Sequence, residues 1–488
     1  MVKGSIKTNF IMNTVLTVLS IIVPIITFPY VSRILLPQGI GKVSFATSII
    51  TYFSLVIQLG VPTYGIKAVA CTRDDADEMS KVVKSLMIIN LFMCVTVYSI
   101  FLILLFNFPQ LFENKLLYLV LSIILITDTL GVEWLYKGLE KYKYITVRSL
   151  FFKFIAMCCI FLFVKNETHF LRYAFFTVLA SVGSNICNFV SLRKNVVNVK
   201  IKKTDILVHI RPVFLLFTMS IATTIYTNMD NIMIGIIHSD IEVGYYSTAV
   251  TLRRALLMFV TSLGTVMLPR TSYYIQHNLL NKFNELSAKA MHFVTLIALP
   301  VMIFTIIVSD IGITIYAGES FLPAASALRY IAPTILLAGW SNITGIQMLI
   351  PLNKEHMVVA SVIGGAIVDF ILNLLWIPSF GFCGAACATT IAEIVVLTIQ
   401  LIALRKENAK RLFQQKWGIY FVCNMIPGIC CVVLRNILNI DMLLLMVLLF
   451  VTYFGVYGLL MLWKKDDIVC ENIFNIYKKI REKAIRSH

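Results

Sequence analysis

The sequence is poor in charge and has no long segment of soluble composition. Only 14% of its 488 residues are Asp, Glu, Lys or Arg, against about 25% in soluble domains. Hydrophobic residues make up 59%, against about 45–50%. These values exclude an ordinary soluble protein and a soluble enzyme held by one anchor. The apolar runs are long and continuous, whereas an outer-membrane barrel needs short alternating segments.

Motifs for metal and nucleotide chemistry are also missing. The 11 cysteines lie mostly in apolar runs, and none forms a CxxC pair or a Cys/His cluster with zinc spacing. The 7 histidines form no HExxH, and no Walker A motif is present. No cleavable signal peptide is evident. We therefore expect no metal site and no cofactor, apart from a coupling proton or sodium ion.

The apolar runs instead predict an all-α integral membrane protein. Each spanning helix needs about 20 mostly apolar residues. We expect about 14 transmembrane helices, at residues 10–32, 43–66, 86–106, 116–136, 146–164, 169–192, 213–236, 244–268, 290–308, 327–350, 357–377, 382–404, 417–436 and 441–463.

The distribution of basic residues predicts the orientation. With both termini on one side, that side carries 32 of the 42 Lys and Arg and the opposite loops carry 6; the other 4 lie within or beside the spans. Basic loops stay in the cytosol, so we expect both termini there. The orientation of the chain in the membrane therefore explains the net charge of +17, and a nucleic-acid-binding surface is not needed to explain it. The tail at 464–488 could lie on the inner leaflet as an amphipathic helix, or be simply solvated.

A faint internal repeat predicts two similar halves. IGKVSFA at 40–46 and VGYYSTA at 243–249 both stand where an outer loop re-enters the membrane. Six spans separate them, so equivalent spans have the same orientation, as in six-helix bundles related by a pseudo-two-fold along the membrane normal. We expect bundles at 1–200 and 201–405, two additional helices at 406–463, and a basic tail at 464–488.

Five basic residues lie within or near the predicted spans. A charge at mid-membrane costs about 2.5–3.5 kcal/mol on insertion scales, so such residues usually face a cavity or a partner. We expect Arg33, Lys153, Arg253, Arg254 and Arg329 to line a cationic, substrate-binding cavity between the halves. Structural pairing or snorkelling is the alternative for each.

Acidic residues also occur at depth. Asp128, Asp369 and Glu393 lie near the middle of their spans, and Asp230 precedes the arginine pair by one span. Each could bind a coupling proton or sodium ion, or neutralise a nearby base. In particular, Asp230 could pair with one of Arg253 and Arg254, which diverge by about 100° on a helix.

Ordered motifs along the chain resemble the Wzx-type flippases for lipid-linked O-antigen and capsule repeat units, in the polysaccharide transporter branch of the multidrug/oligosaccharidyl-lipid/polysaccharide exporter superfamily. Their shared order between about residues 9 and 405 is more specific than any single motif. They are FPYVSRILLPQGIGKVSFA at 28–46, EWLYKGLE at 133–140, DNIMIG at 230–235, EVGYY at 242–246, LPR at 268–270, QMLIPL at 347–352 and GFCGAA at 381–386.

The resemblance implies a flippase that moves an undecaprenyl-pyrophosphate-linked oligosaccharide across the bacterial inner membrane by alternating access, without ATP. It also implies two six-helix bundles, commonly with two extra helices. The lipid-linked oligosaccharide and the bilayer are the expected partners, with a polysaccharide polymerase and a chain-length regulator as further candidates. The alternatives are a cation-coupled small-molecule or drug antiporter of the related branch and, less favoured, a membrane-embedded enzyme. The related antiporters carry an acid in the first span, and this chain has none between Phe10 and Arg33.

Overall fold

The computed structural model describes residues 6–261, 264–405 and 417–465. Within these ranges every regular element is helical, as predicted, and no strand is present. In this described part of the chain, ten helices are long and apolar enough to cross a membrane. Two of them are interrupted by a break, so the number of crossings is not read directly from the number of helices. The predicted tail lies outside the described residues beyond Lys465.

Contacts between Cα atoms divide the chain into two compact units. The first contains residues 1–247 and 370–385, and the second contains 248–369 and 386–488. The units therefore divide within α10 and within α16, and the predicted bundle boundary at residue 200 stays a prediction. The elements of the first unit are α1 (Ile6–Gln58), α2 (Val61–Thr72), α3 (Ala76–Asn107), α4 (Pro109–Phe112), α5 (Lys115–Gly131), α6 (Glu133–Gly138), α7 (Tyr142–Phe163), η1 (Glu167–His169), α8 (Phe170–Leu192), α9 (Lys203–Ile237) and the start of α10 (Asp240–Thr261).

Two apolar cores hold the first unit together. One is formed by α1, α3, α5 and α8 around Phe101 and Tyr118. The other joins α2, α3, α6 and α9 around Leu86 and Trp134. Buried apolar contacts of this kind hold helices together in lipid through close packing, because lipid itself is apolar.

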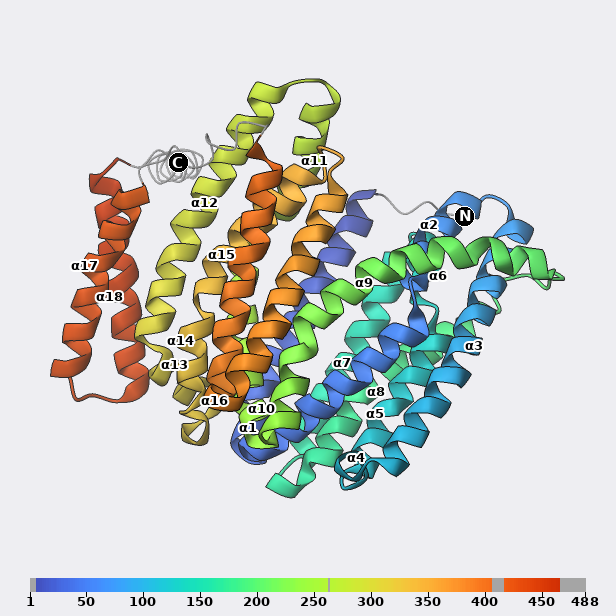
Figure 1. Cartoon of the computed structure of the whole chain (residues 1–488), viewed down its shortest axis with the longest axis horizontal. Helices are drawn as coiled ribbons and strands as arrows, with labels where there is room; N and C mark the ends of the chain where they lie inside the picture. Colours follow the sequence, from blue (N-terminus) through green and yellow to red (C-terminus); the bar gives the residue numbers. More distant parts are fainter. Residues whose placement is uncertain (1–5, 262–263, 406–416, 466–488) are drawn as a thin grey trace, which may run out of the picture. The chain divides into compact units, whose positions relative to one another are not determined.

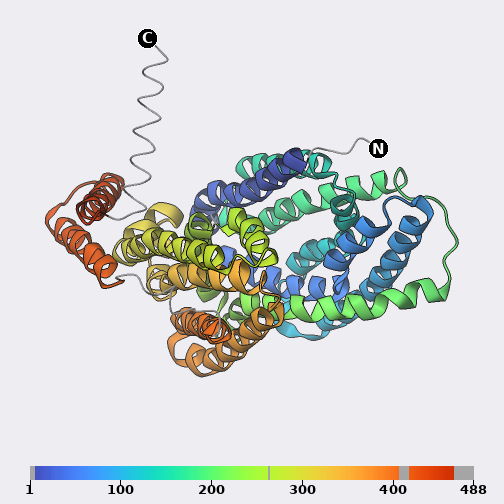
Figure 2. The same ribbon diagram turned by 90° about the horizontal axis from the view of Figure 1, so that it is seen from above.

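The second unit contains the rest of α10 and of α16 and the helices between and after them. Its further elements are α11 (Gly264–Gln276), α12 (Leu280–Ile307), α13 (Ser309–Ala317), η2 (Glu319–Phe321), α14 (Ala324–Ile331), α15 (Pro333–Ser341), the π-helical η3 (Asn342–Leu349), α16 (Glu355–Ala403), α17 (Trp417–Ile437) and α18 (Met442–Trp463). Helices α17 and α18 lie side by side in both views (Figures 1 and 2). They pack on α12, where the Tyr457 hydroxyl donates to the Leu296 carbonyl at 3.0 Å.

Two long helices are broken where the sequence demands it. In α1, Leu36 has φ 58° and ψ 174°, and it precedes Pro37, which disfavours the helical conformation of the residue before it. In α16, the break is at Gly381, with φ 56° and ψ −138°. A residue with a Cβ rarely adopts this conformation. Each break separates two segments that the sequence predicts as separate spans.

The two repeat segments touch each other in the first unit. A Cβ added to Gly41 would lie 1.6 Å from the Asp240 carbonyl oxygen, and one added to Gly244 would lie 2.1 Å from the Pro37 carbonyl oxygen. Both glycines therefore allow backbone-to-backbone packing that no larger residue permits. This contact fixes the second half of α1 against the start of α10.

Gly381→Ala tests the break in α16. The added Cβ would lie 2.3 Å from Glu242 Oε2, in a backbone conformation that costs a non-glycine residue about 1–3 kcal/mol. We expect a lower melting temperature of the purified protein in detergent. Gly455→Ala, in α18 with nothing within 4 Å of its added Cβ, is the control and should leave the melting temperature unchanged. Equal melting temperatures for both variants would contradict this account of the break.

Candidate functional site

A carboxylate surrounded by neutral donors lies inside the first unit. Asp128 on α5 accepts hydrogen bonds from Ser54 Oγ at 3.4 Å and Gln58 Nε2 at 3.2 Å on α1, and from Asn185 Nδ2 at 2.7 Å on α8. Among the described residues, Asp128 has no ion-pair partner. A carboxylate without a fixed counter-charge can bind a proton or a cation reversibly, which is the chemistry expected of an ion-coupling group.

On α7 of the first unit, Lys153 is half-buried and Arg148 is buried. The Lys153 ammonium donates to Ser20 Oγ on α1, a neutral partner. Arg148 is only 7% exposed; its Nε donates to Ser184 Oγ at 2.8 Å, and Nη2 lies 3.9 Å from Glu133 Oε2. Its Nη1 and Nη2 have no hydrogen-bond partner. The count of Lys and Arg on the two sides of the membrane assigns Arg148 to a cytosolic loop. Sequence analysis therefore did not include its buried guanidinium among the candidate site residues.

Asp230 on α9 is 5% exposed and lies where α9, α10 and α16 meet in the first unit. Its carboxylate accepts hydrogen bonds from the Tyr246 hydroxyl and from Asn373 Nδ2, the latter at 2.7 Å. Signals for this set were present in the sequence, because Asp230 and Tyr246 both belong to the ordered motifs. The predicted pairing of Asp230 with Arg253 or Arg254 stays a prediction.

Arg33, which belongs to the first motif, is exposed near the break in α1. Its Nη1 donates to the Pro29 carbonyl at 2.6 Å, one turn earlier. The Pro29 carbonyl accepts this bond within the same segment of α1, before the break at Leu36. The side chain is thus anchored locally, and its predicted role in substrate binding stays a prediction.

In the second unit, Arg253 on α10 is half-buried and its Nη1 donates to Thr334 Oγ1 on α15 at 3.1 Å. Its Nε has no hydrogen-bond partner, and none of the ion pairs among the described residues includes it. A guanidinium held by one neutral hydroxyl retains donors for an anionic ligand. Arg254, the next residue, is exposed.

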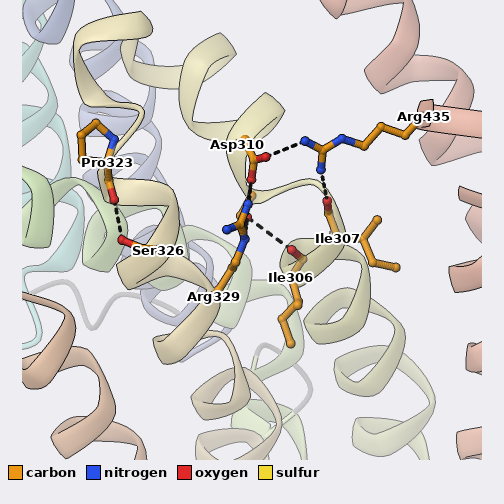
Figure 3. A network of polar contacts seen from close by, with 8 residues as sticks. Ile306, Ile307, Asp310, Pro323, Ser326, Arg329 and Arg435 are labelled. Carbon is orange, nitrogen blue, oxygen red and sulfur yellow. Dashed lines mark hydrogen bonds and ion pairs between the residues drawn. The ribbon is translucent and has the colours of Figure 1, made fainter. Parts of the chain in front are cut away.

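Arg329 on α14 is held differently from Arg253. Its guanidinium pairs with Asp310 on α13, and its Nε donates to Ser309 Oγ at 2.7 Å (Figure 3). Asp310 also accepts from Arg435 Nη2 on α17 at 2.5 Å, while Arg435 Nη1 donates to the Ile307 carbonyl at 3.0 Å. One carboxylate thus joins two arginines from different helices. Sequence analysis missed Asp310, which it placed in an outer loop.

The remaining acids, Asp369 and Glu393, lie on α16 in the second unit. Asp369 is 0% exposed and Glu393 is 8% exposed. Their predicted positions near the middle of the spans stay a prediction. A buried acid is costly unless it is paired or protonated, so both remain candidates for ion coupling.

The residues thus form separate polar sets within each unit. Lys153 and Arg253 contact neutral hydroxyls, whereas Arg329 is paired with a carboxylate. The first arrangement leaves a positive charge available to an anion, and the second neutralises it in part. With ten apolar helices of membrane-spanning length among its described residues, the chain is a multi-pass membrane protein.

Comparison with known proteins identifies the family. The sequence profile described as "Polysaccharide biosynthesis protein" matches residues 6–275, more than half of the chain. The chain belongs to this family. Membership confirms the predicted resemblance to the Wzx-type flippases and the prediction that the chain is a membrane transporter rather than an enzyme.

Relatives and solved structures agree with this assignment. A protein of Escherichia coli K12 named "Putative O-antigen transporter" is 23% identical over 415 residues, which cover 83% of this chain and 98% of that protein. The lipid II flippase MurJ, solved in an inward closed conformation, has a similar fold, with a TM-score of 0.73, 15% identity and coverage of 94% of this chain and 100% of that chain. An inward-facing multidrug transporter of the MATE family has a TM-score of 0.58, 12% identity and coverage of 85% and 97%.

A double-mutant cycle on Asp310→Asn and Arg435→Gln tests whether their ion pair holds α17 to the rest of the second unit. Asp310 and Arg435 side chains are 24% and 33% exposed, so solvent screening limits their coupling to about 1 kcal/mol. We expect each single variant to lower the melting temperature and the double variant to lower it by less than the sum. Strict additivity would contradict the coupling. Arg172→Gln, on α8 of the other unit, is the control.

Proposed function

We propose that this protein is a flippase for an undecaprenyl-pyrophosphate-linked oligosaccharide, acting in the assembly of O-antigen or capsule. The polyprenyl chain stays in lipid while the diphosphate and the sugars cross through the protein. Moving a diphosphate through a low-dielectric region requires cations, and Arg suits it because its forked donors bind phosphate oxygens in pairs.

The observation that supports this proposal most directly is that the Arg253 guanidinium contacts a neutral hydroxyl and no carboxylate among the described residues. Arg253 lies 13 residues after the first residue of α10, about 20 Å along the helix at 1.5 Å per residue. Its side chain contacts the Thr334 hydroxyl rather than an acid. Arg33, Lys153, Arg254 and Arg329 are the further candidates for contacts with the substrate. Of these, Arg329 has to leave Asp310 before it can bind a phosphate.

The proposed architecture has fourteen transmembrane helices. Two six-helix bundles, related by a pseudo-two-fold along the membrane normal, precede two additional helices. In this proposal the breaks at Leu36 and Gly381 are the points where α1 and α16 re-enter the membrane. Both termini face the cytosol of a bacterium, and the protein lies in its inner membrane. Alternating access follows from rocking of the bundles.

Coupling to a proton or a sodium ion is assigned to the buried acids. Asp128 is the best supported, because its three partners are neutral. Asp230, Asp369 and Glu393 are the other candidates. In the cell, a polysaccharide polymerase and a chain-length regulator are the proposed protein partners, since they would receive the translocated unit.

Alanine substitution of Arg253 or Arg254 tests this function. We expect translocation of a lipid-linked oligosaccharide into proteoliposomes to slow by about tenfold or more, since one charge-assisted hydrogen bond contributes about 1.5–3 kcal/mol. Surface-polysaccharide assembly should fall in parallel at normal protein levels. Arg253→Lys, which keeps the charge but loses the fork, should retain part of the activity.

Lys282→Ala, which removes one exposed positive charge from α12, is the matched control and should translocate normally. Unchanged translocation in Arg253→Ala, Arg254→Ala and the double variant would remove both residues from the mechanism. Failure of the unmodified protein to translocate any lipid-linked oligosaccharide, together with drug export that depends on Asp128, would instead support a small-molecule antiporter.

A further inference from the structure

A polar cavity lies at one end of the first unit, apart from the buried charges described above. Its volume is about 310 Å³, and it is an open pocket lined by the second half of α1, the α4–α5 segment and the turn between α9 and α10. Small-molecule sites usually measure about 300–1,000 Å³, so the cavity has room for a ligand of monosaccharide size. Sequence analysis places all three wall segments in or beside loops on the side opposite the termini.

The lining is rich in groups that bind hydroxyls. The α4–α5 wall contributes Gln110, Glu113 and Asn114, and the α9–α10 wall contributes Ser239 and Asp240. Amides and carboxylates can both engage a sugar hydroxyl, because a hydroxyl donates and accepts at once. Phe45, which is partly exposed, also lines the cavity and offers an apolar surface to the C–H face of a sugar ring.

The charge of the lining disfavours an anion. Two carboxylates, Glu113 and Asp240, face one ammonium, Lys42, and that ammonium already lies 5.3 Å from the centre of the Phe170 ring. Burial raises the pKa of Asp240, Lys42 opposes that rise and Glu113 adds to it. A desolvated carboxylate is stabilised by hydroxyl or ammonium donors and destabilised by a phosphate.

The walls are held in place before any ligand arrives. The Asp240 carbonyl packs against Gly41, and the Pro37 carbonyl packs against Gly244, both closer than a Cβ would permit. Tyr118, on the α5 wall, is 2% exposed. A preformed cavity loses little conformational freedom when it binds a ligand.

We propose that this cavity is a binding site for one uncharged or amino-bearing hexose ring of the oligosaccharide, on the extracytoplasmic side. The inference rests on the proposed function for its orientation and for the source of the sugar. It adds a second subsite whose lining has the opposite charge to that of the proposed diphosphate site. Cations bind the diphosphate within the membrane, and carboxylates and amides bind a sugar ring outside it. A sugar held there would oppose the return of the translocated unit.

Three soluble sugars with the same ring and different charge test the site: glucosamine, glucose and glucuronate. Their binding to purified full-length protein is measured by saturation-transfer NMR, with no lipid-linked substrate. We expect saturable binding in which glucosamine and glucose exceed glucuronate by about tenfold, a difference of about 1.4 kcal/mol. Absence of saturable binding, or a preference for glucuronate or inorganic phosphate, would overturn the proposal.

Glu113→Gln combined with Asp240→Asn removes both carboxylates and keeps their shape. Lys42 then makes the lining cationic, and we expect the preference to reverse toward glucuronate. Glu285→Gln, an exposed carboxylate on α12 that pairs with Lys289, is the control and should keep the original preference. The same change in sugar preference in the double variant and in the Glu285→Gln control would overturn the proposal. If the double variant fails to fold, the order in which the unmodified protein binds the three sugars still tests the proposal.

The same preparation is assayed for translocation of the lipid-linked oligosaccharide, so that the two proposals can fail separately. Sugar binding without translocation would contradict the proposed function and leave the sugar site standing. Translocation without sugar binding would remove the sugar site alone.

Discussion

The free-energy cost of placing a charge in lipid determines how the charged side chains of this molecule are compensated. Each charged side chain at depth costs about 2.5–3.5 kcal/mol on insertion scales unless a partner or water compensates it. The chain meets this cost in two ways. Asp310 partly neutralises Arg329 and Arg435 in one ion-paired set, whereas Lys153 and Arg253 contact single hydroxyls. Only the second arrangement leaves a cation ready for an anionic substrate, and the proposed transport chemistry depends on it.

Two backbone breaks divide the long helices α1 and α16. Pro37 and Gly381 interrupt helices that would otherwise run for 53 and 49 residues. Near the first break, Arg33 donates to the Pro29 carbonyl; at the second, the Phe382 amide donates to Glu242 Oε2 at 3.1 Å. At the second break a side chain thus satisfies a backbone group beside Gly381, as a membrane protein requires. Such breaks are also natural points at which a helix can bend during transport.

The helical fold class was predictable from the sequence, because hydropathy depends on local composition. Asp128, Asp230, Asp369 and Glu393 are buried or half-buried within helices, and their roles stay predictions. Partners were not predictable. Asn185 reaches Asp128 across 57 positions, and Arg435 reaches Asp310 across 125, so nothing in the local pattern relates them. Arg148 was missed because its neighbours Lys141 and Lys143 made the segment resemble a cytosolic loop. The fourteen-helix count and the bundle boundaries remain predictions.

The central claim is that cations within the membrane recognise the diphosphate of the substrate. The most direct measurement compares translocation of one oligosaccharide carried on three lipids: a polyprenyl pyrophosphate, a polyprenyl monophosphate and an uncharged polyprenyl ether. The account predicts that the translocation rate falls in that order in proteoliposomes of fixed composition. Equal rates for the pyrophosphate and the uncharged lipid would contradict it.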